Sequence, residues 1–572
     1  MTHGQRGQER RGGRRVVVVG NGMVGSRFAA DLLAHAGQVP VEVVVLGDEE
    51  YAPYNRVLLS EVVAGKVDVT GLDLPEPDDP RVRTHRGAPV VAIDRAARCV
   101  LTGGTRPGAV AYDVLVLATG AAARVPDLPG LEPPVRRPGA TRHAAEGPVL
   151  PAGVHGLRTL DDAREIVAAT ANARHAVVVG AGVLGLEVAT GLARRGVGVT
   201  VLHGGRTLMD RQLAADAGHA VARTLAAQGV DVRTGARTRR VVVVDGRVRG
   251  VEVEVAGEDE LEPVAADLLV LTAGTVARTE IACAAGLTVD RGVVVGDDLA
   301  SPDDPDVYAI GDCAQPPEGG SGLIAQGWDQ SRRLAATLAA RFAGSSGAGS
   351  SGGGPSRGAD AAAGSLTGSA GATSGATSGA TSVGEGQRPV LGTDVVRVKA
   401  TGLQVVAMGV CGARRAPDPA QRVVSLSDPD GGRYVEVVVE DGALVGATCV
   451  GSPDVGADLA TLYTRRTPLP ADPAQLLLRP VAPAAVAVTS PTHMPSRATV
   501  CHCNGVTKGD VVACWKDGAR TVEDVARATR ATTGCGGCKD VVCGLVDWLR
   551  ADDARPAEPD QAPTAASPVP TV

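Results

Sequence analysis

The stretch VVVVGNGMVG, residues 16–25, joins four consecutive valines to three glycines in the spacing G-x-G-x-x-G. An unbroken apolar run is typical of a strand buried on both faces, and these glycines let a backbone turn approach a pyrophosphate at the start of a helix. A helical pattern (SRFAADLLAHAG, 26–37) and a second apolar strand (VEVVVLG, 41–47) follow. The stretch therefore predicts a βαβ dinucleotide-binding unit that uses Gly20, Gly22 and Gly25.

The second strand ends in Asp48-Glu49, about 23 residues beyond Gly25, where an acid would accept hydrogen bonds from ribose hydroxyls. An ordinary tight turn is the alternative, because the chain contains 75 Gly among 572 residues. The acid and the flanking strand and helix favour the nucleotide site.

The same order returns in AVVVGAGVLGLE, residues 176–187, with Gly180, Gly182 and Gly185 in the glycine positions and Glu187 on the predicted helix. The next strand ends in His203, with Arg206 close by, where an NAD-selective site would normally carry an acid. The missing acid removes repulsion against a 2′-phosphate, but one Arg does not decide between NADH and NADPH.

Composition limits the partners that we expect. The formal charge is −7 over 572 residues, and no Lys/Arg patch alternates with aromatic residues, so no nucleic acid is expected. No apolar run approaches the ~20 residues of a membrane helix, and the N-terminus shows no signal peptide. We therefore expect no membrane partner and a reducing, cytoplasmic location.

Four of the 11 cysteines form two tight pairs near the C-terminus, Cys501/Cys503 and Cys535/Cys538. Two close pairs of thiolates can converge on one metal centre, either an iron-sulfur cluster or a structural zinc. Two nucleotide-binding units upstream on the same chain favour the redox centre, because together they form a redox module that such a centre can follow.

Several motifs resemble the FAD/NAD(P)-dependent pyridine nucleotide-disulfide oxidoreductase superfamily. They are GNGMVG, APYNRVLLS (52–60), YDVLVLATGAAARVP (112–126), GAGVLGLE, TLMDRQL (207–213) and VYAIGDCA (307–314). Within it, the likeness is to the flavin part of assimilatory nitrite reductase large subunits and nitrate reductase electron-transfer subunits. The helix after the first glycine loop lacks the paired Cys of the disulfide reductases, so electrons are expected to leave by another route.

The resemblance implies the residues that bind the two nucleotide cofactors. For FAD they are Gly20, Gly22, Gly25, Asp48 with Glu49 as the alternative, Arg56, Val90, Thr119, Gly120, Arg124, Gly311 and Asp312. For NAD(P)H they are Gly180, Gly182, Gly185, Glu187, His203 and Arg206, and Gly274 completes the cofactor-binding set. Asp312 is expected to bond the ribityl chain, and no general acid or base is expected.

The segment 500–542 resembles the bacterioferritin-associated-ferredoxin-like (BFD-like) [2Fe-2S] module that follows the flavin part in those reductases. This resemblance implies Cys501, Cys503, Cys535 and Cys538 as cluster ligands. Cys543, on an apolar helix, is expected in the core, and His502 near the cluster or exposed.

The fold predicted is α/β, with two Rossmann-like nucleotide-binding domains, a small α+β reductase domain and a small helical BFD-like module. The boundaries expected are 14–150 and 268–342 for a discontinuous FAD domain, 151–267 for the inserted NAD(P) domain, 343–388 for a Gly/Ser/Ala linker, 389–478 for the α+β domain, 479–497 for a linker, 498–550 for the module and 551–572 for a disordered tail.

The function expected is electron transfer from NAD(P)H through FAD and a [2Fe-2S] cluster to a separate nitrite or nitrate reductase catalytic subunit. No sirohaem domain follows the module, so nitrite reduction within this polypeptide is not expected. The alternatives are a ferredoxin or rubredoxin reductase serving an oxygenase, and a non-enzymatic docking or iron-sensing module on an inactive flavin scaffold. The sequence does not decide the oligomeric state, and a homodimer is one possibility.

Overall fold

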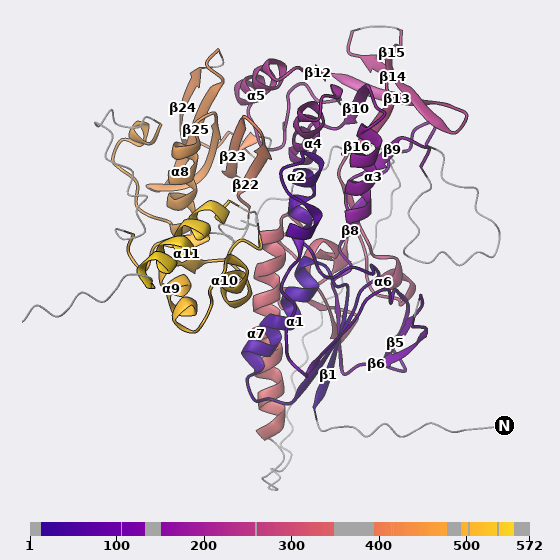
Figure 1. Cartoon of the computed structure of the whole chain (residues 1–572), viewed down its shortest axis with the longest axis vertical. Helices are drawn as coiled ribbons and strands as arrows, with labels where there is room; N and C mark the ends of the chain where they lie inside the picture. The colour runs from indigo at the N-terminus through magenta and orange to yellow at the C-terminus, as the bar shows by residue number, and fades with distance from the viewer. Residues whose placement is uncertain are drawn as a thin grey trace, which may run out of the picture.

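A computed structural model describes residues 13–104, 106–131, 150–257, 260–347, 394–412, 415, 417–428, 430–477, 494–501, 504–534 and 537–553 (Figure 1). Within these ranges no helix is long and apolar enough to cross a membrane. The predicted tail lies outside them from residue 554 onward, and so does most of the predicted 343–388 linker.

The first domain is built on a six-stranded sheet in the order β19-β20-β7-β1-β2-β3. Its strands are β1 (Arg14–Val19), β2 (Val41–Leu46), β3 (Val82–His85), β7 (Val114–Leu117), β19 (Ala300–Ser301) and β20 (Asp304–Ala309). The pairs from β20 to β3 are parallel, and the valine-rich runs of β1, β2 and β7 are buried, as the central strands of a parallel sheet require. Because β20 pairs with β7, the chain returns to this sheet about 190 residues later, so the domain is discontinuous.

Helices α1 (Met23–Ala36) and α7 (Ile324–Gly347) pack together against this sheet (Figure 1). Since α7 runs to Gly347, the predicted linker begins too early at 343. An antiparallel sheet of β4 (Val90–Asp94), β5 (Cys99–Thr102) and β6 (Gly108–Ala111) adjoins the domain and carries α6 (Glu280–Ala284). The shorter elements are η1 (Arg56–Leu58), α2 (Leu59–Val63), η2 (Val69–Leu72), β18 (Val293–Val294), η3 (Gly311–Cys313) and β21 (Ala314–Gln315).

The second domain has a parallel sheet in the order β12-β11-β10-β16-β9. Its elements are β9 (Val154–Gly156), α3 (Leu160–Thr170), β10 (His175–Val179), α4 (Val183–Arg194), β11 (Gly198–His203), α5 (Ala215–Ala227), β12 (Val230–Thr234), β13 (Ala236–Val244), β14 (Arg247–Val255), β15 (Glu262–Ala265) and β16 (Leu268–Leu271). Strands β13–β15 form a separate antiparallel sheet.

The predicted boundary between residues 267 and 268 is wrong, because β16 lies in this second sheet between β10 and β9. The chain crosses back only after Leu271. There β17 (Thr275–Ala277) pairs antiparallel with β8 (Ala121–Ala123), so the outward and return connections run side by side.

The third domain is an antiparallel sheet in the order β22-β23-β26-β25-β24, covered by α8 (Pro453–Arg465). Its other elements are β22 (Val396–Ala400), β23 (Leu403–Gly409), β24 (Arg422–Asp428), β25 (Arg433–Glu440), β26 (Ala443–Val450) and η5 (Pro473–Leu476). An Asp-Gly pair between two apolar strand patterns predicts a hairpin turn at Asp441-Gly442. The turn is confirmed, since both residues have positive φ, 50° and 72°, between β25 and β26.

The C-terminal module consists of β27 (Thr499–Cys501), β28 (Val506–Thr507), α9 (Lys508–Lys516), α10 (Val522–Thr529) and α11 (Lys539–Asp553). Reciprocal side-chain to backbone bonds cap α9 through Thr507 and Asp510, and α10 through Thr521 and Asp524. The sequence VEDVARATRA, residues 522–531, has a helical pattern, and its first eight residues form α10.

Candidate cofactor sites

The three glycines of the first loop are required for two different reasons. Gly20 has φ +115°, and a Cβ there would lie 2.1 Å from the carbonyl oxygen of Ala118; a Cβ on Gly25 would lie 2.0 Å from the carbonyl oxygen of Gly20. The turn itself therefore excludes side chains at both positions. Gly22, the N-cap of α1, is different, because the nearest atom to an added Cβ is Arg56 Nε at 3.8 Å. The fold leaves open space beside Gly22, at the helix N-terminus where a pyrophosphate fits.

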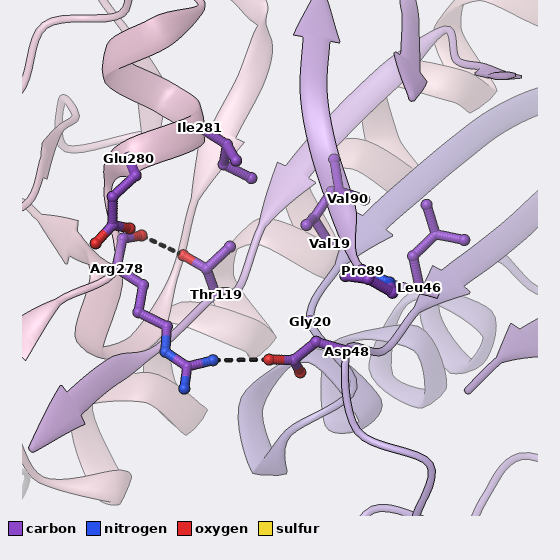
Figure 2. Close-up of a pocket in the computed structure, with 10 residues that line it drawn as sticks. All are labelled: Val19, Gly20, Leu46, Asp48, Pro89, Val90, Thr119, Arg278, Glu280 and Ile281. Atoms are coloured by element: carbon purple, nitrogen blue, oxygen red, sulfur yellow. Dashed lines mark hydrogen bonds and ion pairs between the residues drawn. The ribbon is translucent and has the colours of Figure 1, made fainter. Parts of the chain in front are cut away.

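A pocket beside this loop brings together four of the predicted FAD residues, Gly20, Asp48, Val90 and Thr119 (Figure 2). The other residues that line it are Val19, Leu46, Pro89, Arg278, Glu280 and Ile281. Of the apolar members, Val19 and Leu46 end β1 and β2 of the first sheet, Pro89 and Val90 lie at the start of β4, and Ile281 lies in α6. The pocket thus combines an apolar wall, which suits an adenine, with two acidic residues, Asp48 after β2 and Glu280 in α6, and Asp48 is placed to suit a ribose.

Arg278 is a pocket residue that the sequence analysis missed. Its Nη1 donates to Asp48 Oδ2 at 2.7 Å, and its carbonyl oxygen accepts from Thr119 Oγ1 at 2.7 Å (Figure 2). Its backbone N–H donates to the carbonyl oxygen of Gly120 at 3.0 Å. Nothing in the sequence pairs Arg278 with an acid 230 residues away; only the pairing of β8 with β17 brings the two together.

The structure distinguishes Asp48 from Glu49. The Glu49 carboxylate accepts from Tyr54 OH at 2.7 Å and forms an ion pair with Arg56, whose guanidinium lies 4.8 Å from the centre of the Tyr54 ring. Burial lowers the pKa of Arg56, but the electrostatic interactions with Glu49, Tyr54 and Asp48 and the hydrogen bond to Glu49 together outweigh burial, so the pKa is raised overall. Both carboxylates are therefore ion-paired, Glu49 with Arg56 and Asp48 with Arg278, but of the two only Asp48 lines the pocket.

The remaining predicted FAD residues lie where the domains meet. Asp312, in η3, forms an ion pair with Arg158, whose Nε also donates to the carbonyl oxygen of Ala121 at 3.0 Å. Gly311 has φ +76°, and its N–H donates to Gln330 Oε1 at 2.7 Å. The exposed Arg124 donates its N–H to the carbonyl oxygen of Gly274 at 3.0 Å.

The second glycine loop repeats the geometry of the first. A Cβ on Gly180 would lie 2.6 Å from the carbonyl oxygen of Thr272, and one on Gly185 would lie 2.0 Å from that of Gly180. Gly182 has no atom within 4 Å of an added Cβ. In this loop too, the fold leaves no room for a side chain at the outer two glycines but leaves space beside the middle one.

Glu187 is placed away from the open face of this loop. Its side chain is 4% exposed and accepts from Ser60 Oγ at 2.6 Å and from the Lys399 N–H at 2.8 Å. The Lys399 ammonium lies 3.6 Å from the same carboxylate. Glu187 thus ties α4 to α2 and β22, a structural contact that the sequence did not reveal.

Two buried polar atoms fit the nucleotides that these loops would bind. Among the described residues, Asn21 Nδ2 and His203 Nε2 are buried without a hydrogen-bond partner. Asn21 lies between the first two glycines of the first loop, and His203 ends β11 behind the second loop, 3.9 Å from Asp210. Buried polar atoms are normally hydrogen-bonded, so polar atoms of a ligand are suitable partners for these two. Arg206 is exposed near His203.

The cysteine module presents two of its four predicted ligands in described positions. Cys501 ends β27 and Cys538 precedes α11, and both are buried, 0% and 6% exposed. Cys501 Sγ accepts from Asn504 Nδ2 at 3.7 Å, and Cys538 Sγ accepts from the Thr532 N–H at 3.3 Å. Donors aimed at sulfur stabilise thiolates in iron-sulfur sites, so this donor set suits a cluster.

Cys503, Cys535 and His502 lie outside the described residues, and within the described part no three metal-binding side chains gather. Cys514 is engaged within its own helix, since its thiol donates to the carbonyl oxygen of Val511 at 3.1 Å. Burial also raises the pKa of this thiol, which disfavours the thiolate that a metal ligand requires. Cys543 is half-buried on α11.

Together, two dinucleotide loops in stacked α/β domains define a two-nucleotide oxidoreductase fold. The model of pyridine nucleotide-disulphide oxidoreductases matches residues 14–341, and the chain belongs to this family. A BFD-like [2Fe-2S] binding domain matches residues 499–547. The cofactors are therefore FAD, NAD(P)H and a [2Fe-2S] cluster.

Curated relatives match nearly the whole chain. A nitrite reductase [NAD(P)H] of Bacillus subtilis is 27% identical over 93% of this chain and 57% of its own length. An assimilatory nitrate reductase electron transfer subunit of the same species is 26% identical over 94% of this chain and 60% of its own. The chain thus spans less than two thirds of either relative. In fold it resembles putidaredoxin reductase in its covalent complex with putidaredoxin, with a TM-score of 0.60, 23% identity, and coverage of 81% of this chain and 95% of that one.

Proposed function

We propose that this chain takes electrons from NAD(P)H and delivers them, by way of bound FAD and a [2Fe-2S] cluster, to a separate nitrite or nitrate reductase catalytic subunit in the cytoplasm. The observation that carries the proposal is the presence, on one chain, of two glycine loops with open middle positions and of a matched [2Fe-2S] domain. The relatives named for nitrite and nitrate reduction match across both parts.

The electron count explains why both parts are needed. NAD(P)H gives up a hydride, which carries two electrons, whereas a [2Fe-2S] centre accepts one electron at a time; bound FAD supplies the conversion between the two. The residues of the chain hold the reactants. Gly22 and Gly182 leave room for phosphates at two helix N-termini, Asp48 lines the pocket suited to a ribose, and Cys501 and Cys538 offer sulfurs that accept hydrogen bonds.

Anaerobic titration tests the cofactor chemistry. NADH and NADPH are added separately to protein purified without oxygen, while flavin absorbance and the electron paramagnetic resonance (EPR) signal of the cluster are recorded. We expect one nucleotide to bleach the flavin and then to produce the rhombic signal of a reduced [2Fe-2S] centre. Zinc without iron or acid-labile sulfide would contradict the proposal.

A reconstituted assay tests the acceptor. We expect NAD(P)H-dependent loss of nitrate or nitrite when the chain is mixed with a purified molybdenum nitrate reductase or sirohaem nitrite reductase that lacks its own reductase. Reduction of dyes with no transfer to either enzyme would refute the assignment to nitrogen assimilation and would favour a ferredoxin-type partner.

A further inference from the structure

The C-terminal module has a hydrophobic core of its own. Among the described residues, this core, which includes Val511, Trp515, Val525 and Leu545, draws only on positions between 494 and 549. By contrast, a single core joins residues 54–72 of the first domain with the second domain and with β22 and β23. Figure 1 shows the helices of the module (yellow) beside α1 and α7. Because the described parts of the module and of the first domain share no apolar core, specific polar contacts are needed to fix where the module sits.

Asn55 makes the first such contact. It is 2% exposed, and its Nδ2 donates to the carbonyl oxygens of Thr533 at 3.0 Å and Gly534 at 2.6 Å. Its Oδ1 accepts from the Val57 N–H at 3.1 Å and so caps η1. One side chain therefore joins the turn that carries Arg56 to the loop that leads into Cys535.

Arg27 makes the second contact from the other side. It is 6% exposed, stacks 4.8 Å from the centre of the Trp328 ring, and donates from Nη1 to Asn504 Oδ1 at 2.5 Å. Asn504 in turn donates from Nδ2 to the carbonyl oxygen of Arg530 at 2.7 Å and towards the sulfur of Cys501 at 3.7 Å.

Each of the two contacts holds a different cysteine loop: Asn55 contacts the loop before Cys535, and Arg27 contacts the loop after Cys503. Gly534 immediately precedes Cys535, and Asn504 immediately follows Cys503. On the first domain, Arg27 lies two residues after Gly25, at the start of the helix that follows the first glycine loop. The contacts thus connect the surroundings of the predicted FAD site to both halves of the predicted cluster site.

We propose that Asn55 and Arg27 are positioning residues that hold the two cysteine loops against the first nucleotide-binding domain, so that electrons pass from the flavin to the cluster within one chain. This inference rests on the proposed function. It goes further in assigning the route to an intramolecular docked state and in naming the side chains that maintain it. Because these contacts are polar and each depends on a side-chain donor, exchanging either donor shifts the docking equilibrium.

The sharpest perturbation is Asn55→Asp. Aspartate keeps the oxygen that caps η1, but it replaces the donor amide with an anion facing two carbonyl oxygens. Each net hydrogen bond shifts an equilibrium by about fivefold, so the loss of two predicts at least a tenfold fall in the docked state. Arg27→Gln removes the contact with Asn504 from the opposite side.

Two readouts are measured on the full-length protein loaded with its cofactors. Amide hydrogen exchange of residues 499–534 reports docking without any turnover. Anaerobic stopped-flow and freeze-quench EPR, after mixing with NAD(P)H, report flavin bleaching and cluster reduction separately. We expect both variants to exchange faster in these loops and to reduce the cluster at least about tenfold more slowly, with flavin bleaching within twofold of the parent.

Matched controls carry the same changes elsewhere. Asn172→Asp alters an exposed asparagine after α3, and Arg332→Gln alters an exposed arginine on α7. Both are expected to behave as the parent in exchange and in cluster reduction. If Asn55→Asp fails to retain flavin or iron, Asn55→Ser, which also removes the amide donor but adds no charge, takes its place.

The outcomes separate the two proposals. Parent-like exchange and cluster reduction in both variants overturn the positioning role while the proposed function stands. A change in only one variant overturns the role of the other residue. A parent protein with no reducible iron-sulfur centre overturns the proposed function itself, whatever the variants do.

Discussion

The role of the middle glycine of each loop in cofactor binding can be tested separately from its effect on stability. In Gly22→Ala the new methyl meets nothing closer than Arg56 Nε at 3.8 Å, and the backbone, at φ −80° and ψ −171°, suits any residue. The cost to the cofactor-free chain is that of alanine instead of glycine at an N-cap, about 1 kcal/mol or less. In Gly25→Ala the methyl would stand 2.0 Å from a carbonyl oxygen, so the backbone must shift by roughly 1 Å, at a cost of about 3 kcal/mol.

Although Gly22→Ala should cost the cofactor-free chain little stability, we expect it to weaken FAD binding strongly. The methyl of Gly22→Ala enters the space that a pyrophosphate would use, so we expect FAD affinity to fall at least about a hundredfold, or about 2.7 kcal/mol. Urea unfolding of cofactor-free protein gives the stability, and FAD titration gives the affinity. Gly182→Ala is the matched control, because it makes the same change in the second loop.

We expect Gly182→Ala to retain FAD and to be reduced by dithionite, but to lose bleaching by NAD(P)H at concentrations that saturate the parent. Parent-like FAD affinity in Gly22→Ala would show that the first loop does not bind the pyrophosphate. Loss of FAD in Gly182→Ala would show that the two loops are not separate sites.

Three further predictions concern the cluster, a buried carboxylate and acid stability. Cys501→Ser should lose the cluster EPR signal and bound iron, while Cys514→Ser should keep both; equal iron in the two proteins would contradict the ligand assignment. Lys399→Met should lower the free energy of unfolding in urea by about 2 kcal/mol, because the buried Glu187 carboxylate loses its cation but keeps two hydrogen bonds; unchanged stability would contradict this. The Arg174 N–H lowers the pKa of Asp267, so its stabilisation should be present above about pH 4 and lost as pH falls further; Asp267→Asn should flatten this fall in the urea midpoint of cofactor-free protein, and a parallel fall in both proteins would refute it.

Local sequence signals were sufficient for much of the fold. The valine runs before Gly20 and Gly180 are buried parallel strands, and Asp441-Gly442 is the turn of a hairpin. Each of these elements depends on residues a few positions apart. The domain return at β20 was also predictable, because VYAI is a strand followed by a glycine turn.

What the sequence could not reveal is which distant residues meet. Leu268–Leu271 has the apolar pattern of a buried strand, but the pattern does not say which of two similar sheets it joins, and the boundary at 267 was therefore wrong. The pairing of Arg278 with Asp48 spans 230 residues and follows from the antiparallel contact of β8 with β17.

The docking of the cysteine module shows the same limit most clearly. The cysteine spacing identifies the module because its ligands are local, whereas Asn55 and Gly534 are 479 residues apart and Asn55 by itself is an ordinary cap of a short helix. Both of its functions use one amide group, the oxygen for the cap and the nitrogen for the module. A substitution that preserves only the cap is therefore the change that separates folding of the first domain from placement of the cluster.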